Sequence, residues 1–272
     1  MAYHILGDVH THTLYSRHAY STIAENVAAA AEAGLEILGS TDHFSNMLYA
    51  DAEIRNFQYL GNTVSWPRTW QGVTLLRGCE VDIVGLAGEL FGQDIPVRSN
   101  IVGMPEDRER SLFDRVTGGL DYLIASVHDN AFANGATMVE TTEMYLGALQ
   151  NPRVFILGHT GRAGVPFDVD EVVACAKEHH KLIEINEHSL DSDGSGAYRS
   201  VCGHIAQRCA ELGCGIAVSS DAHVAPLIGQ YAEVPRMLEE IHFPEELIVN
   251  RGREPFVREL AAAGVCDLTS LL

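Results

Sequence analysis

The sequence is poor in basic residues, and this shortage limits the partners that we expect for it. Its 272 residues include 18 lysines and arginines against 37 aspartates and glutamates, so the formal net charge is −19. Such an acidic surface repels nucleic acid at long range, which argues against duplex nucleic acid as a partner. A local cationic site remains compatible with this charge, because salt screens exposed charges beyond about 10 Å.

Long apolar runs and a leader are missing as well. No apolar run approaches the ~18 residues expected of a membrane span. The opening residues, Met1-Ala2-Tyr3-His4-Ile5-Leu6, contain neither a basic segment nor a long apolar stretch, so they do not read as a secretory signal peptide. We therefore expect no transmembrane helix, no membrane partner and a first strand that begins almost at once.

Three common catalytic or binding motifs are also absent. None of the six cysteines belongs to a Cys-x-x-Cys pair, which argues against a thiolate zinc site. We interpret these cysteines as reduced and mostly buried, as is usual in a cytoplasmic protein. There is neither a Gly-x-Ser-x-Gly elbow nor a P-loop, so the sequence suggests no protein nucleophile and no nucleotide-binding loop of those types.

What the sequence does contain is a regular alternation of strands and helices. This alternation is the signature of βαβ units, and the hydrophobic content of 46% supports a large core. We expect seven strands, at residues 3–10, 35–41, 73–81, 121–127, 154–157, 181–186 and 215–219. We expect helices at residues 22–33, with a Thr22-x-x-Glu25 capping box, and at 137–149, 168–179, 197–212, 224–241 and 254–263. The pattern predicts one α/β domain of seven βα units over residues 1–272.

Three segments depart from this alternation. Residues 44–72 and 85–118 are less regular and are expected to be insertions, and residues 242–272 give a helical extension without an eighth strand. Long loops often carry function, so we expect residues 85–118 to form a lid or specificity loop, with a solvated decoration of the barrel rim as the alternative. Substrate specificity is expected to come from residues 44–72 and 85–118.

Each of the seven predicted strands runs directly into a histidine, a carboxylate or an asparagine. Residues at the carboxyl ends of parallel barrel strands converge at one mouth, where catalytic groups of such barrels lie. The pattern therefore predicts a barrel with a metal centre at its mouth. The strand ends are Asp8-Val9-His10-Thr11-His12, Thr41-Asp42-His43, Cys79-Glu80, Val127-His128, Gly158-His159, Glu184-Ile185-Asn186 and Asp221-Ala222-His223.

Two of these strand ends have the spacing of a chelating pair. His10 and His12 are two residues apart, as are Asp221 and His223, so both members of each pair lie on the same side of an extended backbone. A single buried histidine is more often a core residue than a ligand. Two such pairs at strand ends in one chain favour a metal site.

Four short runs stand in order along residues 3–224. They are Asp8-Val9-His10-Thr11-His12-Thr13, Ser16-Arg17-His18-Ala19-Tyr20-Ser21, Ser40-Thr41-Asp42-His43 and Ser219-Ser220-Asp221-Ala222-His223. Together they resemble the motifs of the polymerase and histidinol phosphatase (PHP) family, and within it the small stand-alone, YcdX-type phosphatases with three zinc ions. The resemblance implies a distorted, TIM-like (β/α)7 barrel, which agrees with the unit count above.

The resemblance also implies a set of metal ligands. It assigns His10, His12, Glu80 and Asp221 to one metal ion. A second ion would share Glu80 and bind His128 and His159, and a third would bind His18, His43 and His223. We expect three divalent ions, zinc first, with iron or manganese as alternatives, because imidazole and carboxylate ligands suit all three metals.

The expected reaction is hydrolysis of a small phosphomonoester by a metal-bound hydroxide. Arg17 and Arg162 stand beside ligand histidines and are candidates for holding phosphate, with surface ion pairs as the alternative. His188 is a candidate general acid, and Asp42, beside His43, is expected to orient an imidazole. We also keep three other functions open: a histidinol-phosphate phosphatase, a nucleotide phosphatase or nuclease, and a non-catalytic metal-binding module. The sequence does not determine the oligomeric state.

Overall fold

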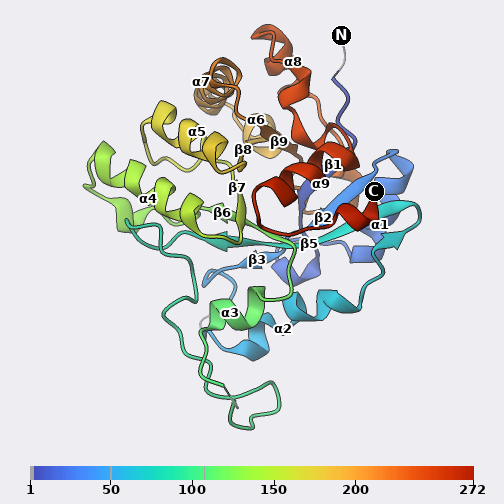
Figure 1. The fold of residues 1–272 in the computed structure, drawn as a ribbon, viewed down its shortest axis with the longest axis vertical. Coiled ribbons are helices and arrows are strands. Elements are labelled where there is room, and N and C mark those ends of the chain that lie inside the picture. The colour runs from blue at the N-terminus through green and yellow to red at the C-terminus, as the bar shows by residue number, and fades with distance from the viewer. Residues whose placement is uncertain (1–2, 50, 107) are drawn as a thin grey trace.

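A computed structural model describes residues 3–49, 51–106 and 108–272. Met1 and Ala2, the first residues of the segment that we expected not to be a signal peptide, lie outside the described residues. Seven parallel strands form a nearly closed barrel, in the order β1-β2-β5-β6-β7-β8-β9 (Figure 1). They are β1 (Gly7–Thr11), β2 (Ile37–Ser40), β5 (Val73–Asp82), β6 (Tyr122–Ser126), β7 (Val154–Leu157), β8 (Leu182–Asn186) and β9 (Ile216–Ser219). This confirms the predicted α/β barrel of seven strands.

Helices follow each of these strands and surround the barrel (Figure 1). They are α1 (Ile23–Glu32), α2 (Ile54–Asn62), α3 (Leu112–Thr117), α4 (Met138–Gln150), α5 (Val169–Glu178), α6 (Glu187–Asp191), α7 (Ala197–Leu212), α8 (Glu233–Glu240) and α9 (Arg253–Ala262). The capping box expected at the start of α1 is present, because Thr22 and Glu25 each accept a backbone hydrogen bond from the other. No helix among the described residues has the length and apolarity that crossing a bilayer would need.

One helix prediction was wrong in its extent. Residues 224–241 do not form a continuous helix: a 3-10 turn covers Ala225–Leu227, and α8 begins only at Glu233. Pro226 stands inside the 3-10 turn, and Gly229 has a φ of 68°, a left-handed conformation that ends a helix. This break leaves a loop between β9 and α8 at the mouth of the barrel.

The two predicted insertions have some structure of their own. Residues 44–72 contain α2, the second residue of the short strand β3 (His43–Phe44) and the short strand β4 (Thr69–Trp70); both strands pair with β5. Residues 85–118 run as a long loop into α3, and this loop extends away from the barrel (Figure 1).

The C-terminal segment closes the barrel where β1 and β9 would otherwise be unpaired. At the mouth, a bridge between Thr11 and Ala222 joins the two sides, and the Asp221 N–H donates to the His10 carbonyl at 3.0 Å. At the opposite end the buried side chain of Asn250 donates to the carbonyl oxygens of Gly7 and Val218 at 2.5 and 2.6 Å, and accepts from the Val218 N–H at 2.9 Å. Residues after β9 therefore complete the barrel without adding an eighth strand.

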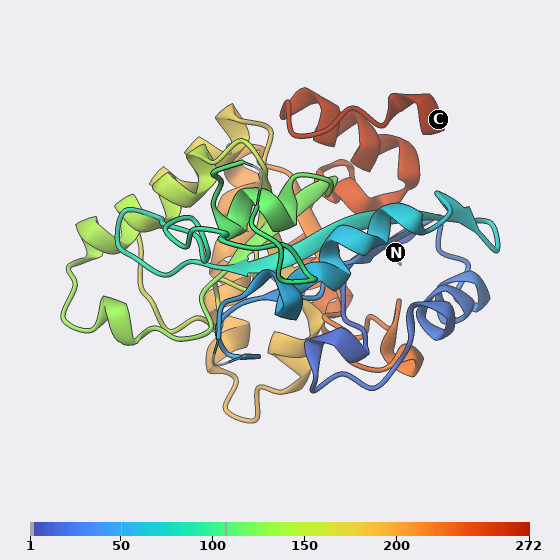
Figure 2. The same cartoon turned by 90° about the horizontal axis from the view of Figure 1, so that it is seen from below.

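An aromatic cluster fills the barrel below the mouth. Phe256 of α9 packs edge-on against Tyr122 and Phe155, with ring centroids 5.9 and 5.3 Å away. The Tyr122 hydroxyl crosses the interior and donates to the Val9 carbonyl at 2.5 Å. It passes Gly39 so closely that a Cβ there would lie 2.1 Å from the hydroxyl oxygen, so only glycine fits. We call this end, with α9 across it, the floor; Figure 2 shows α9 on the side of the barrel opposite α6.

Candidate metal centre

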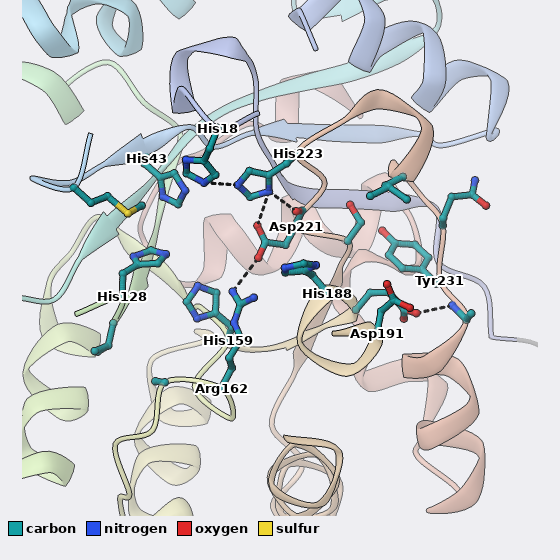
Figure 3. A pocket seen from close by; sticks show the side chains of 18 of the residues that line it. His18, His43, His128, His159, Arg162, His188, Asp191, Asp221, His223 and Tyr231 are labelled. Atoms are coloured by element: carbon teal, nitrogen blue, oxygen red, sulfur yellow. Dashed lines mark hydrogen bonds and ion pairs between the residues drawn. The ribbon is translucent and has the colours of Figure 1, made fainter. Parts of the chain in front are cut away.

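The carboxyl ends of the strands bring together all nine residues that the sequence resemblance assigned as ligands. Six of them line one side of the pocket in Figure 3: His18, His43, His128, His159, Asp221 and His223. His10, His12 and Glu80 lie beneath them and are fully buried. The short strand β3 contributes to this convergence, because its pairing with β5 sets His43 in register with Glu80.

Glu80 is the hub of this cluster. Its Oε1 lies 2.7 Å from His159 Nε2 and 3.3 Å from His128 Nε2. Its Oε2 lies 2.8 Å from His43 Nδ1 and 3.3 Å from His10 Nε2. His12 Nε2 lies 3.5 Å from the same Oε2, so one carboxylate faces five imidazoles that come from four different strand ends.

A second acid completes the other side. Asp221 Oδ1 lies 3.1 Å from His12 Nε2 and 3.6 Å from His10 Nε2. Beyond them, the Nε2 atoms of His18 and His223 face each other at 2.9 Å. Asp221 has a φ of 56°, a conformation that is strained for a residue with a side chain and that is found most often at functional sites.

The unpaired atoms of this cluster test whether it suits a metal. Buried polar atoms nearly always have a hydrogen-bond partner. Here several of the candidate ligand atoms lie close to one another yet make no hydrogen bond: His10 Nε2, His12 Nε2, both ring nitrogens of His43, Glu80 Oε2 and His159 Nδ1. Three groups of ligand atoms lie within 4.8 Å of one another, namely His10, His12 and Asp221; His43, Glu80 and His128; and His12, His43 and His223. Imidazole and carboxylate atoms without thiolate fit zinc, iron or manganese.

Other side chains hold the imidazoles in the orientation that ligation requires. His10 Nδ1 lies 2.7 Å from Glu184 Oε1, and His128 Nδ1 lies 2.7 Å from Asp82 Oδ1. An acceptor at Nδ1 favours the tautomer with its proton there, which leaves the Nε2 lone pair for a metal. Both Nε2 atoms point toward Glu80.

Asp42 acts on His12 through a serine. Ser16 Oγ donates to Asp42 Oδ1 at 2.6 Å and lies 2.9 Å from His12 Nδ1. The same oxygen accepts the N–H of His43 at 3.2 Å. Asp42 also accepts from the N–H and the hydroxyl of Thr13 at 2.7 and 2.6 Å, so it is fully engaged behind the ligands. Its geometry is that of a group that orients His12.

The charges of the cluster support one another. Burial alone would raise the pKa of Glu80, but His128, His10 and His43 hold it well below its ordinary value. Burial would lower the pKa of His128, yet Glu80 and Asp82 raise it to about 10. Burial, together with the charge of His43, holds the pKa of His12 well below its usual value. Glu80 is thus charged at neutral pH, and metal binding would displace protons from imidazoles such as His128.

The remaining predicted site residues differ in where they lie. Arg162 and His188 line the pocket, and Arg162 Nη2 donates to Asp221 Oδ2 at 3.1 Å (Figure 3). Arg17 does not line it: its guanidinium donates to the Leu48 carbonyl oxygen and lies 4.9 Å from the centroid of the Tyr49 ring. The backbone of Arg17 is left-handed, with a φ of 61°.

The pocket itself is a cavity of about 770 Å³ whose walls were only partly foreseen. Met47 is the one described lining residue from residues 44–72, and no described residue of 85–118 lines it, contrary to the expectation of a specificity loop there. The far wall comes instead from α6 and the loop before α8, including Asp191, Gln230 and Tyr231.

Apart from His188, sequence reasoning missed this wall, because α6 is too short to show a helical period. It also missed Asp82, although Asp82 stands two residues after Glu80 and repeats the spacing of the other ligand pairs.

Comparisons with known proteins agree with this geometry. The model of the PHP domain matches residues 8–191. A probable phosphatase of Clostridium acetobutylicum is 39% identical over 259 residues, which cover 95% of this chain and 96% of that protein.

Two solved structures share the fold at lower identity. One is histidinol phosphate phosphatase from Lactococcus lactis in complex with zinc, L-histidinol and phosphate, with a TM-score of 0.50 and 14% identity over 88% of this chain and 95% of that one. The other is a chain of archaeal ribonuclease P with mature tRNA, with a TM-score of 0.51 and 12% identity over 94% and 90%. Because one fold serves both, it does not by itself identify a substrate.

Proposed function

This chain belongs to the PHP domain family, and from that premise we propose that it is a metal-dependent phosphatase of small phosphomonoesters. The observation that carries the proposal is the convergence of seven histidines, Glu80 and Asp221 at the barrel mouth with several ligand atoms buried and unpaired. The name of the Clostridium acetobutylicum relative, a probable phosphatase, supports the same reaction.

We propose three divalent ions, zinc first and iron or manganese as alternatives. His10, His12, Glu80 and Asp221 would hold one ion; Glu80, His128 and His159 a second; and His18, His43 and His223 a third. The group of His10, His12 and Asp221 within 4.8 Å supports the first assignment, and the contacts of Glu80 Oε1 support the second. His43, assigned here to the third ion, also borders the second, since it forms one close group with His12 and His223 and another with Glu80 and His128.

When bound, such ions supply an activated water as nucleophile and positive charge for the phosphoryl oxygens. The chain's own residues would then hold the phosphate and orient the leaving group. Arg162 lines the pocket beside Asp221 and is placed to donate to a phosphate oxygen, which would pair its remaining N–H groups. His188 lines the same pocket and is our candidate for protonating the leaving group.

The location is proposed as cytoplasmic. All six cysteines are free thiols, and four of them are buried. Free thiols are usual in a reducing compartment, which supports this assignment.

The test is hydrolysis by the metal-reconstituted full chain. We expect turnover of p-nitrophenyl phosphate that disappears with a chelator and returns with zinc or manganese. The variant His12→Ala should lose both turnover and bound metal, because it removes a buried ligand that nothing replaces. The matched control is His204→Ala, which changes an exposed histidine of α7 outside the site.

The panel also separates the alternatives. It adds histidinol phosphate, a nucleoside monophosphate and a single-stranded oligonucleotide. A higher kcat/KM for one of these than for p-nitrophenyl phosphate would identify the corresponding function: histidinol-phosphate phosphatase, nucleotide phosphatase or nuclease. Full metal content without hydrolysis of any ester would overturn the proposal and favour a non-catalytic metal-binding module.

A further inference from the structure

The pocket extends well beyond the ligand side chains. Its volume of about 770 Å³ is in the range of pockets that enclose a whole small molecule. Figure 3 shows His188, Asp191 and Tyr231 at the end away from His43 and His128. If phosphate binds at the metal centre, this second end is where the rest of a substrate would lie.

Two polar groups of this second end are already engaged within the protein. Glu187 accepts the N–H groups of Ala232, Glu233 and Val234 at 2.9, 2.7 and 2.9 Å, and so anchors the start of α8. The Tyr231 hydroxyl donates to the Gly7 carbonyl at 3.1 Å. Glu187 therefore has little capacity left for a ligand, and Tyr231 contributes mainly the surface of its ring.

Asp191 is different, because its carboxylate makes no hydrogen bond and no ion pair with any described residue. Its side chain is exposed in the pocket. Arg162, the arginine that lines this pocket, is paired with Asp221 instead. The amide of Gln230 likewise lines the pocket without a partner inside the described part of the chain.

The position of Asp191 is not explained by stability. It is the last residue of α6, and a carboxylate at the carboxyl end of a helix is opposed by the exposed carbonyl groups there. No lysine or arginine offsets it among the residues described. An acid in that place is therefore best understood through what enters the pocket.

From this arrangement, and resting on the proposed function, we infer that Asp191 selects the leaving group by charge. The pocket accepts phosphomonoesters whose leaving group is neutral or cationic and donates hydrogen bonds to Asp191 and Gln230. It rejects a second anionic group, as in a bisphosphate or a polynucleotide. Two unit charges about 5 Å apart near a protein surface interact strongly enough to change a rate by roughly ten- to a hundredfold.

The test uses three aryl phosphates of similar size that differ in charge. They are 4-(aminomethyl)phenyl phosphate, p-nitrophenyl phosphate and 4-carboxyphenyl phosphate. Their intrinsic reactivities differ, so the quantity compared among variants is the ratio of kcat/KM for the cationic ester to that for the anionic ester. We expect Asp191→Asn to lower this ratio about tenfold and Asp191→Lys to lower it further.

Glu143→Gln is the matched control, because it removes the same charge from the exposed face of α4, where Glu143 has no partner among the described residues. It should leave the ratio unchanged, and circular dichroism should show that all three variants are folded. Hydrolysis of all three esters with a ratio that does not depend on residue 191 would overturn the inference while the proposed function stands. If no ester is hydrolysed by the metal-loaded chain, the proposed function fails and this inference fails with it.

Discussion

The mouth and the floor of the barrel are built from the same strands but follow opposite rules. At the mouth, charged and polar side chains are buried with unpaired atoms, and the backbone of Asp221 and His159 is left-handed. At the floor, Phe256 packs into an aromatic cluster and Asn250 satisfies the backbone groups of two strands. The difference indicates that the mouth is organised to bind and the floor to hold the barrel together, so activity and stability should respond to different substitutions.

The largest effect is expected from Glu80→Gln at the mouth. The change removes the charge that faces five imidazoles, so the centre should lose metal and kcat/KM should fall on the order of a thousandfold, which corresponds to about 4 kcal/mol. Metal content and hydrolysis of p-nitrophenyl phosphate measure it. Glu143→Gln, with the same chemical change on α4, is the control and should keep both. Full metal occupancy with wild-type turnover in Glu80→Gln would contradict the assignment of Glu80 as the hub.

The next largest effect is expected at the floor, in Phe256→Ala. Removing a fully buried ring should lower the free energy of unfolding by about 3–5 kcal/mol, while kcat/KM per folded molecule stays the same. Urea unfolding and active-site titration measure the two quantities. Phe256→Leu keeps most of the volume and should cost less than about 1.5 kcal/mol.

A matched control at the same end is Leu272→Ala, because Leu272 is 45% exposed. It should change stability by no more than about 0.5 kcal/mol. A loss of turnover in folded Phe256→Leu would mean that the floor shapes the mouth, and the contrast between the two ends would fail.

Much of the barrel could be predicted because buried parallel strands are continuous apolar runs. The strand at 154–157 and the helix at 197–212 were predicted with the bounds that the structure has. The helix at 224–241 was predicted wrongly, because the prediction followed the apolar periodicity and gave too little weight to Pro226 and Gly229, which break the helix. The closure of the barrel by Asn250 is a contact between distant segments that no local pattern records.

The site shows the same division between local and distant information. The spacing of His10 and His12 indicated a ligand pair, because it depends only on the alternation of a strand. The contact of Glu184 with His10 depends on which strands are neighbours across the barrel. The Arg17 side chain points away from the pocket, and its backbone has a left-handed conformation that the local sequence does not predict.

A smaller effect is expected from Ser16→Ala, which leaves every ligand in place. Without Ser16, His12 loses the partner of its Nδ1 and Asp42 loses its link to the ring. Such outer partners typically contribute 10- to 100-fold in metal affinity or activity. Titration against a competing chelator should show weaker metal binding, and excess metal should restore kcat. Ser65→Ala, at an exposed position of a 3-10 turn, is the control. Unchanged metal affinity in Ser16→Ala would limit Asp42 and Ser16 to a structural role.

The smallest effect is expected from Thr137→Ala, on the outer layer between the two ends. Thr137 is the N-cap of α4, and its side chain accepts the N–H of Glu140. Its loss should cost about 1 kcal/mol of stability, seen as a lower urea midpoint with an unchanged slope, and Thr137→Ser should restore most of it. Turnover should not change, although the segment between β6 and α4 contains the proposed ligand His128. A fall in kcat together with the urea midpoint would mean that α4 positions His128. The outer helices would then support activity, as the mouth does, and not stability alone, as the floor does.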